Sequence, residues 1–328
     1  MIKVSRRHFL AGAAALPFAT PMVARAQATE LRLGLITPVG HSWNDAALRL
    51  GEVLKERSDG RLTVSVFHSG QLGNEPAMMQ QLQSGALELG IIQAAELGSR
   101  VDHIAAINAP YLVRSTDAVA KFVRHPEVLK LFEVLPQETG TVGLGWAITG
   151  MRTVFSAKPI ETIKDLNGMK LRINPTPVYR DFYQLLGAAP TPIPTPQVFD
   201  AMSNGQVDGL EADIEFSWNQ RFDKVAKSIL RMNALFMPAA AVASGRFWAN
   251  LPDADRELIS GAVRTVLDEQ IDSLAAEEPA LIKNFEGTGV PMHVVPESDT
   301  TELIAAFDKI WVPKAPIITR LREIGASL

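Results

Sequence analysis

The chain has 328 residues, a formal net charge of −4 and no cysteine. The lack of cysteine excludes disulfides, thiol nucleophiles and thiolate metal sites, and the acidic balance lacks the clustered positive charge of nucleic-acid binding. With 47% apolar residues the chain can bury a sizeable core, and its length is typical of two domains.

Residues 1–28 differ in composition from the rest, because they hold four of the 32 basic side chains and none of the 36 acidic ones. Arg6-Arg7 precedes Phe9-Leu10, an apolar run follows over 11–23, and small residues end the segment. This pattern predicts an export signal cleaved near Ala26 or Ala28, of the twin-arginine type, with an ordinary Sec signal as the alternative. The apolar run is too short for a permanent membrane anchor. The remainder has 28 basic and 36 acidic side chains, a formal charge of −8.

The first half alternates strand and helix patterns. We predict strands over 31–36, 62–66, 88–92 and 141–147, and helices over 44–58, from 74 onward, over 116–124 and over 126–138. This order is typical of an α/β fold with a largely parallel sheet.

A second cycle begins near Gly150. It predicts strands over 152–156 and 169–173, a short helix around Ile163 and a helix over 178–186. Prolines then occupy every second position from 190 to 196, which is compatible with a polyproline linker. We favour a short extended segment that leads into a helix ending near Gly205, because Thr195 suits an N-cap and Pro196 the first helical position.

The last third is dominated by a helix predicted over 253–285. At about 30 residues it would be roughly 45 Å long, longer than one small lobe. We predict a strand over 292–295 and a final helix from about 300. These patterns favour two lobes, the first comprising residues 29–149 plus about 238–270 and the second residues 150–237 plus about 271–328.

No common catalytic motif occurs, and the six histidines lie without ligand spacing, so we predict no metal and no cofactor. Acid pairs such as Glu211 and Asp213 are more often solvated than catalytic. Arg172 is more informative, because it lies opposite the apolar face of its strand and near the carboxyl end, where ligands bind in open α/β sheets. Taken alone, such an arginine is more often a solvated side chain.

Four stretches, in this order, resemble the solute-binding proteins of tripartite ATP-independent periplasmic (TRAP) transporters. They are Phe67-x-x-Gly70-Gln71-Leu72-Gly73 with Glu75; Gly150-Met151-Arg152 leading to Lys158-Pro159-Ile160; Asp165-Leu166-x-Gly168-x-Lys170-Leu171-Arg172; and Gly187-Ala188-x-Pro190-Thr191-Pro192 followed by Gly205-Gln206-Val207-Asp208-Gly209-x-Glu211. The resemblance runs from Leu31 to the C-terminus. It implies a two-lobe clamshell that closes on its ligand and is crossed by strands and by one long helix.

The resemblance also implies a binding site. Arg172 matches the arginine that grips the ligand carboxylate, for which a planar guanidinium is suited, and Arg152 matches a second arginine of the same cleft. Glu75 and Gln93 match positions in the first lobe that touch the rest of the ligand, although a solvated helix start and a polar strand end are the alternatives. The further candidates are Asp213, Glu211, Asn174, Trp218 and His41.

This chain departs from the family pattern where an asparagine often follows the glutamate of the Asp-Gly-x-Glu run. Here Ala212 follows Glu211, and Asp213 comes next. If Asp213 faces the cleft, it disfavours a second ligand carboxylate and favours hydroxyl or ammonium groups. Phe216 and Trp218 are candidates for walls on that side, with core packing as the alternative.

The leading hypothesis is therefore a periplasmic receptor that binds a small organic acid, such as a sugar acid or hydroxy acid, and delivers it to the TRAP membrane subunits without catalysis. A C4-dicarboxylate ligand is the alternative within the family. A secreted hydrolase or lyase with Glu75 or Glu211 as base, and a receptor of an ATP-driven transporter, are the alternatives of other kinds.

Overall fold

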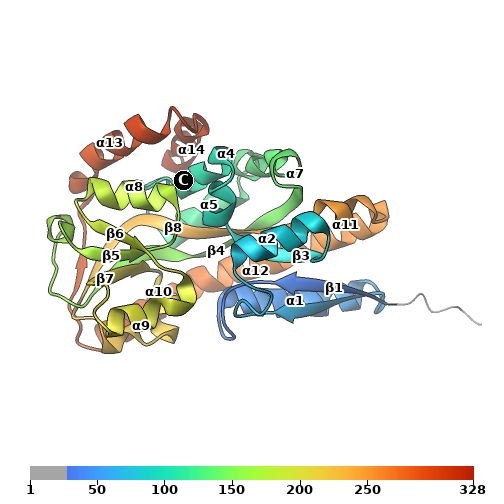
Figure 1. The fold of residues 1–328 in the computed structure, drawn as a ribbon, viewed down its shortest axis with the longest axis horizontal. Coiled ribbons are helices and arrows are strands. Elements are labelled where there is room, and N and C mark those ends of the chain that lie inside the picture. The colour runs from blue at the N-terminus through green and yellow to red at the C-terminus, as the bar shows by residue number, and fades with distance from the viewer. Residues whose placement is uncertain (1–27) are drawn as a thin grey trace, which may run out of the picture.

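Two long strands, β4 (Thr141–Ser156) and β8 (Ser228–Ser244), run side by side through the middle of the molecule (Figure 1). The computed structural model describes residues 28–328, so the predicted signal segment lies almost entirely outside it. The other strands are β1 (Thr29–Gly34), β2 (Leu62–Phe67), β3 (Leu89–Gln93), β5 (Lys170–Ile173), β6 (Ala189–Pro192), β7 (Gly209–Ala212) and β9 (Met292–Val294).

All nine strands form one sheet with the order β2-β1-β3-β8-β4-β7-β5-β6, and β9 pairs with β8. The flanking groups are parallel within themselves, but β3–β8, β8–β4 and β4–β7 are antiparallel. The predicted largely parallel sheet is therefore wrong at the centre. The physical reason is that the chain crosses between the two halves along β4 and returns along β8, in the opposite direction.

The strands predicted over 141–147 and 152–156 are one continuous strand, β4. Register shifts against β8 between residues 143 and 145, 149 and 151, and 151 and 153 interrupt the alternation without ending the pairing. Gly150 lies inside β4 and does not begin a new segment. A Cβ there would lie 2.7 Å from the Glu278 carboxylate, the end of a flexible side chain on α12.

The described helices cover both faces of the sheet. The longer ones are α1 (Ser42–Arg57), α2 (Glu75–Ser84), α5 (Thr116–Arg124), α8 (Pro177–Leu185), α12 (Asp253–Glu286), α13 (Thr301–Trp311) and α14 (Ile317–Ala326). The shorter ones are α3 (Ala94–Gly98), α4 (Asp102–Ala105), α6 (Pro126–Leu129), α7 (Leu135–Glu138), α9 (Val198–Ser203), α10 (Ile214–Asn219) and α11 (Gly245–Ala249).

Two predicted helices are divided by proline. The helix predicted over 126–138 consists of α6, a 3₁₀ turn (Lys130–Val134) and α7, in which Pro136 occupies the first turn. The single C-terminal helix is divided into α13 and α14, because Pro313 and Pro316 lack the backbone N–H that continuation needs. Pro190 and Pro192 lie in the extended strand β6, as favoured above, and a 3₁₀ turn (Thr195–Gln197) and α9 follow. Thr195 is the first residue of that turn, after Pro194, so its prediction as an N-cap is wrong.

The long helix is confirmed as α12, with 34 residues and Pro279 inside it. It packs against α1 and β4 and then against α10, so that it crosses from one half of the sheet to the other. The predicted lobe boundaries at 149/150, 237/238 and about 270/271 fall inside β4, β8 and α12 and remain predictions. Between residues 28 and 328 no helix combines the length and apolar character needed to cross a bilayer.

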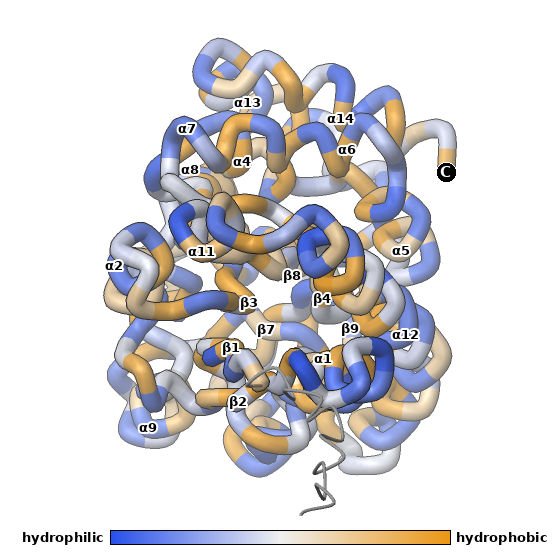
Figure 2. Tube along the Cα trace, turned by 90° about the vertical axis from the view of Figure 1, so that its right-hand side faces the viewer, coloured by the Kyte–Doolittle hydropathy of each residue, from blue (hydrophilic) through white to orange (hydrophobic). Residues whose placement is uncertain are grey.

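The buried apolar residues form a large cluster around the central strands and a smaller one beside the far end of β4 and β8. Figure 2 shows hydrophobic stretches along the inner strands and hydrophilic ones alternating with them on the outer helices. In the smaller cluster Phe155 contacts Phe222 and Phe285. The larger and the smaller apolar cluster thus pack against the two halves of the sheet, on either side of their junction.

Candidate functional site

Two connected cavities lie where the two halves of the sheet meet. The inner cavity has a volume of about 30 Å³ and is lined by Thr37, His41, Trp43, Gln93, Thr149, Arg152, Arg172, Asn174, Thr195, Asp213, Phe216 and Met237. The outer cavity has a volume of about 410 Å³, shares Gln93, Asn174 and Thr195 with the inner one, and includes Glu75. The segments that follow β1, β2, β5, β6 and β7 supply most of these residues, and a smaller group lies within the strands: Gln93, Thr149, Arg152, Arg172 and Met237. Both halves therefore contribute to one site.

Arg172 of β5 is 1% exposed and lines the inner cavity. Its Nε donates to Ile193 O at 2.9 Å, and its Nη2 donates to Asn174 Oδ1 at 2.8 Å and to Thr195 Oγ1 at 3.4 Å. In the described part of the chain no carboxylate lies within ion-pair distance of it. Burial lowers the pKa of Arg172 to about 10, and Glu211 opposes this shift. A buried guanidinium that contacts only neutral acceptors has the chemistry to pair with an anion.

Arg152 of β4 also faces the inner cavity, but it is bound by two acids. Its Nε donates to Glu211 Oε2 and its Nη1 to Asp213 Oδ2 at 3.0 Å, while its Nη2 donates to Glu211 O at 2.8 Å. Burial by itself lowers the pKa of Arg152, but Glu211 and Asp213 raise it overall. The charge of Arg152 is therefore neutralised inside the protein.

Glu211 connects the two arginines from behind the cavity. It is fully buried, and its Oε1 accepts from the Asn174 N–H at 3.2 Å while its Oε2 binds Arg152. Asn174 in turn accepts from Arg172. Glu211 lines neither cavity, so its role here is to hold Arg152 and the loop after β5.

Asp213 lines the inner cavity, which was the condition for its influence on the ligand in the sequence analysis. One carboxylate oxygen binds Arg152, and the other accepts from Phe216 N at 2.8 Å and caps α10. Two arginines and two acids are thus buried together, and both acids contact Arg152. Arg172 is left as the cation that faces the cavity without an acidic contact among residues 28–328.

Glu75 and Gln93 form the first-half wall of the outer cavity. Glu75 is the first residue of α2, and its Oε1 accepts from Gln93 N at 2.7 Å. Burial raises the pKa of Glu75 to about 8, and the Gln93 N–H opposes the shift. At neutral pH the carboxyl group is therefore mainly protonated, and its O–H can donate a hydrogen bond to a ligand.

His41 also lies at the inner cavity, where its Nδ1 accepts from Trp43 N and caps α1. Trp218 does not: its ring packs against Phe285, with centroids 5.3 Å apart, in the smaller core. The structure thus brings together all the sequence candidates except Trp218, with Glu211 behind the cavity wall.

Sequence reasoning missed Thr37 and Thr149, which both line the inner cavity. Their hydroxyls are buried and have no hydrogen-bond partner among residues 28–328. Thr149 precedes the Gly150-Met151-Arg152 motif. Because the register of β4 shifts here, the alternation of side chains along the strand does not predict on which face of the sheet Thr149 lies. Two unpaired buried hydroxyls facing a cavity are suited to a ligand that carries hydroxyl groups.

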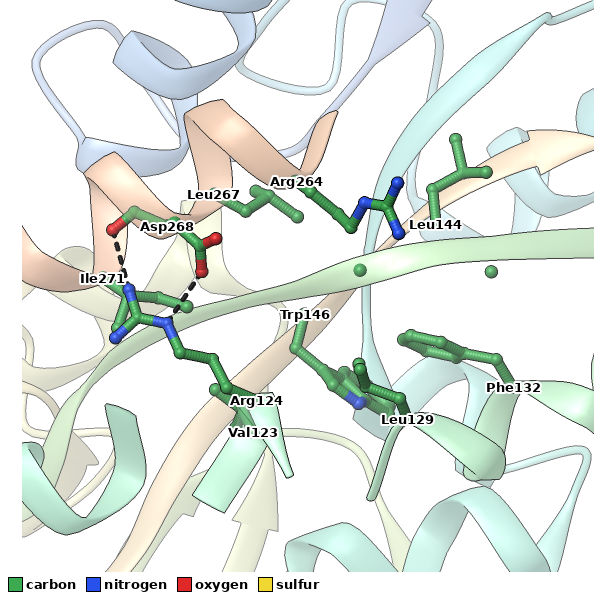
Figure 3. A pocket seen from close by; sticks show the side chains of 12 residues that line it. Val123, Arg124, Leu129, Phe132, Leu144, Trp146, Arg264, Leu267, Asp268 and Ile271 are labelled. Carbon is green, nitrogen blue, oxygen red and sulfur yellow. Dashed lines mark hydrogen bonds and ion pairs between the residues drawn. The ribbon is translucent and has the colours of Figure 1, made fainter. Parts of the chain in front are cut away.

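A separate cavity of about 450 Å³ lies between α12, α5, the 3₁₀ turn after α6 and the first half of β4 (Figure 3). Its walls include Phe132, Trp146 and Leu267. Arg124 at its side is already paired with Asp268 and Asp272. The walls of this cavity are mainly apolar, and of its two arginines Arg124 is paired and Arg264 is exposed. It therefore lacks a buried cation with only neutral contacts, such as Arg172 in the site between the two halves.

Residues 33–314 match the family model described as bacterial extracellular solute-binding protein, family 7. The sialic acid-binding periplasmic protein SiaP of Vibrio cholerae is 26% identical over 80% of this chain and 82% of its own length. The 2,3-diketo-L-gulonate-binding periplasmic protein YiaO of Escherichia coli is 26% identical over 86% of this chain and 84% of its own.

Among solved structures, a TRAP periplasmic solute-binding protein of Citrobacter koseri with bound D-glucuronate superposes with a TM-score of 0.84. It is 24% identical, and the match covers 92% of this chain and 99% of that one. This likeness confirms the two-lobe fold of the TRAP receptors. The chain belongs to family 7 of the bacterial extracellular solute-binding proteins.

Proposed function

We propose that the protein binds a polyhydroxylated monocarboxylate, a sugar acid or hydroxy acid, and delivers it to the membrane subunits of a TRAP transporter. The observation that carries this proposal is Arg172, a buried guanidinium with neutral contacts only. A carboxylate that leaves water needs such a cation and its hydrogen bonds in compensation. The free hydroxyls of Thr37 and Thr149 are suited to the hydroxyl groups of the same ligand.

The balance of buried charge favours one ligand carboxylate over two. Arg152 is occupied by Glu211 and Asp213, so that the site offers one cation in need of a partner. A second carboxylate near Asp213 would meet like charge in a region of low dielectric. A C4-dicarboxylate is therefore the weaker candidate.

The ligands named for three similar proteins agree with this choice, whereas a similar solved structure from Shewanella oneidensis holds succinate. Sialic acid, 2,3-diketo-L-gulonate and D-glucuronate, which appear in the names of the three proteins compared above, each combine one carboxylate with several oxygen substituents. The hydrolase or lyase alternative is disfavoured by local contacts, because both carboxylate oxygens of Glu211 are already engaged.

A panel of acids tests the proposal. We expect D-glucuronate, D-galacturonate and D-galactonate to raise the melting temperature of the purified protein, because binding to the native state alone stabilises it. Succinate, which carries two carboxylates and no hydroxyl, should give a smaller shift at the same concentration. A larger shift with succinate would favour the dicarboxylate alternative. Recovery of each sugar acid unchanged after long incubation would separate a receptor from an enzyme.

Arg172 is tested by substitution. Arg172→Ala should weaken binding of D-glucuronate by more than a hundredfold, since leaving a buried charge unpaired costs roughly 3–5 kcal/mol. Arg172→Lys keeps the charge but loses the planar guanidinium that can form two parallel hydrogen bonds. Its affinity for D-glucuronate should therefore lie between those of the wild type and Arg172→Ala. Calorimetry measures the affinities, with Arg264→Ala, an exposed arginine beside the separate cavity, as the control. Wild-type affinity in a folded Arg172→Ala protein would contradict this carboxylate position.

Glu75 gives a prediction about pH. The raised pKa of Glu75 means that the folded protein holds its proton up to about pH 8, whereas the unfolded chain releases it near pH 4.3. Glu75 therefore contributes to the free energy of unfolding in full below about pH 4.3, the pKa in the unfolded chain. This contribution is lost as the pH rises through the folded pKa of about 8.

Ligand affinity should also fall above about pH 8, by up to about tenfold per pH unit, because ionised Glu75 repels an anionic ligand. Titrations at several pH values compare the wild type with Glu75→Gln, which stays neutral. The variant should keep its affinity across the range. A parallel decline in both proteins would assign the pH effect to another group.

We also propose that the protein is exported in folded form by the twin-arginine pathway, with cleavage near Ala26 or Ala28. The support is the Arg6-Arg7 pair ahead of Phe9-Leu10. Replacing both arginines by lysine should leave the precursor in the cytoplasm, as measured by cell fractionation and immunoblotting. Continued maturation of the double variant would identify the Sec pathway instead.

A further inference from the structure

The short helix α10 contacts the opposite half of the molecule at two points. The Glu215 carboxylate accepts hydrogen bonds from Ser42 N at 2.8 Å through Oε1 and from Ser42 Oγ at 2.9 Å through Oε2. One turn further along, Asn219 Nδ2 donates to Gly40 O at 3.2 Å. Gly40 lies in the loop between β1 and α1, Ser42 is the first residue of α1, and both are 173 residues or more distant in sequence from their partners on α10. None of these residues lines the inner cavity.

Ser42 is a point where three elements meet. It is the first residue of α1, so its N–H has no acceptor within the helix, and the helix dipole there favours a negative charge. Glu215 of α10 supplies both the acceptor and the charge. From α12, Gln270 Nε2 donates to Ser42 Oγ at 3.2 Å and to Ile148 O at 2.9 Å. The Trp43 indole N–H also donates to Ile148 O.

The residues on each side of this contact form one wall of the inner cavity. Thr37, His41 and Trp43 line it from the β1–α1 side. On the α10 side, Asp213 both lines the cavity and caps the helix that carries Glu215. Few residues separate the cavity from this contact on either side, and the Glu215 carboxylate makes two of the three hydrogen bonds that join α10 to Gly40 and Ser42.

We propose that Glu215 is a positioning residue for ligand binding, which holds the segment from Thr37 to Trp43 against the ligand from outside the cavity. The inference rests on the proposed function, because it assigns a binding role to a wall of that site. Burial raises the pKa of Glu215, which His41 and the hydrogen bonds from Ser42 oppose. The Glu215 carboxylate is largely removed from water, and both of its oxygens accept hydrogen bonds from Ser42. These charge-assisted hydrogen bonds hold Ser42 in one position relative to α10.

The test compares affinity for D-glucuronate with the stability of the ligand-free protein. Glu215→Ala should weaken binding roughly tenfold, as expected for the loss of charge-assisted hydrogen bonds, and Glu215→Gln, which can still accept one of them, should weaken it less. Ser42→Ala should cost less in the Glu215→Ala background than in the wild type, since the two side chains act through each other. Glu269→Gln is the matched control, because Glu269 lies on the same side of the molecule in an exposed pair with Arg49 and should bind as the wild type does.

Hydrogen exchange supplies a readout that needs no ligand. In the ligand-free protein, Glu215→Gln and Glu215→Ala should both speed amide exchange in the peptide that contains Gly40 to Trp43, while the Glu269→Gln control should not. Unchanged exchange in this peptide would overturn the positioning role by itself. Wild-type affinity in Glu215→Ala, or an equal loss in the Glu269→Gln control, would overturn it too. A wild-type protein that binds none of the sugar acids would instead refute the proposed function.

Discussion

A cluster of buried charge decides how this molecule is organised. Arg152, Arg172, Glu211 and Asp213 are each 4% exposed or less, and removing such groups from water is costly unless each finds compensation. Three of them satisfy one another, while Arg172 relies on a carbonyl, an amide and a hydroxyl oxygen. Of the four charged groups, Arg172 is the one whose contacts are all neutral, and under the proposed function the ligand carboxylate would be its charged partner.

The surrounding architecture keeps this cluster in place. Arg152 comes from β4, Arg172 from β5, and the two acids from the end of β7 and the cap of α10. Those strands are neighbours in the order β4-β7-β5, so the charged side chains are fixed by backbone pairing and not by flexible loops. Positioning on paired strands is what allows a small number of contacts to select a ligand.

Much of the fold and part of the site follow from sequence. The periodicity of α12 was sufficient to predict the long helix, because it depends on local pattern alone. For Arg172 alternation indicated only that the side chain lies opposite the apolar face of its strand, and the role in binding came from the family resemblance. The strands β7 and β8 were not predicted: β7 has four residues and β8 is a nearly continuous apolar run, which periodicity cannot assign. Thr149 was missed because bulges change the facing of side chains in β4. The pairing of Arg152 with Glu211 and Asp213 could not be predicted either, because it depends on how β4 and β7 align in the sheet.

The order of strands has a consequence for how the chain can fold. In the sheet β3 pairs with β8, so that residues 89–93 have their partners in residues 239–243. About 150 residues of intervening chain must be synthesised before this edge is completed, and such high contact order slows folding. The first half of the sheet is therefore not an autonomous unit, and excising it at its junction with β4 would leave an open apolar strand edge prone to aggregation. Domain exchange between homologues would have to move β4 and β8 together.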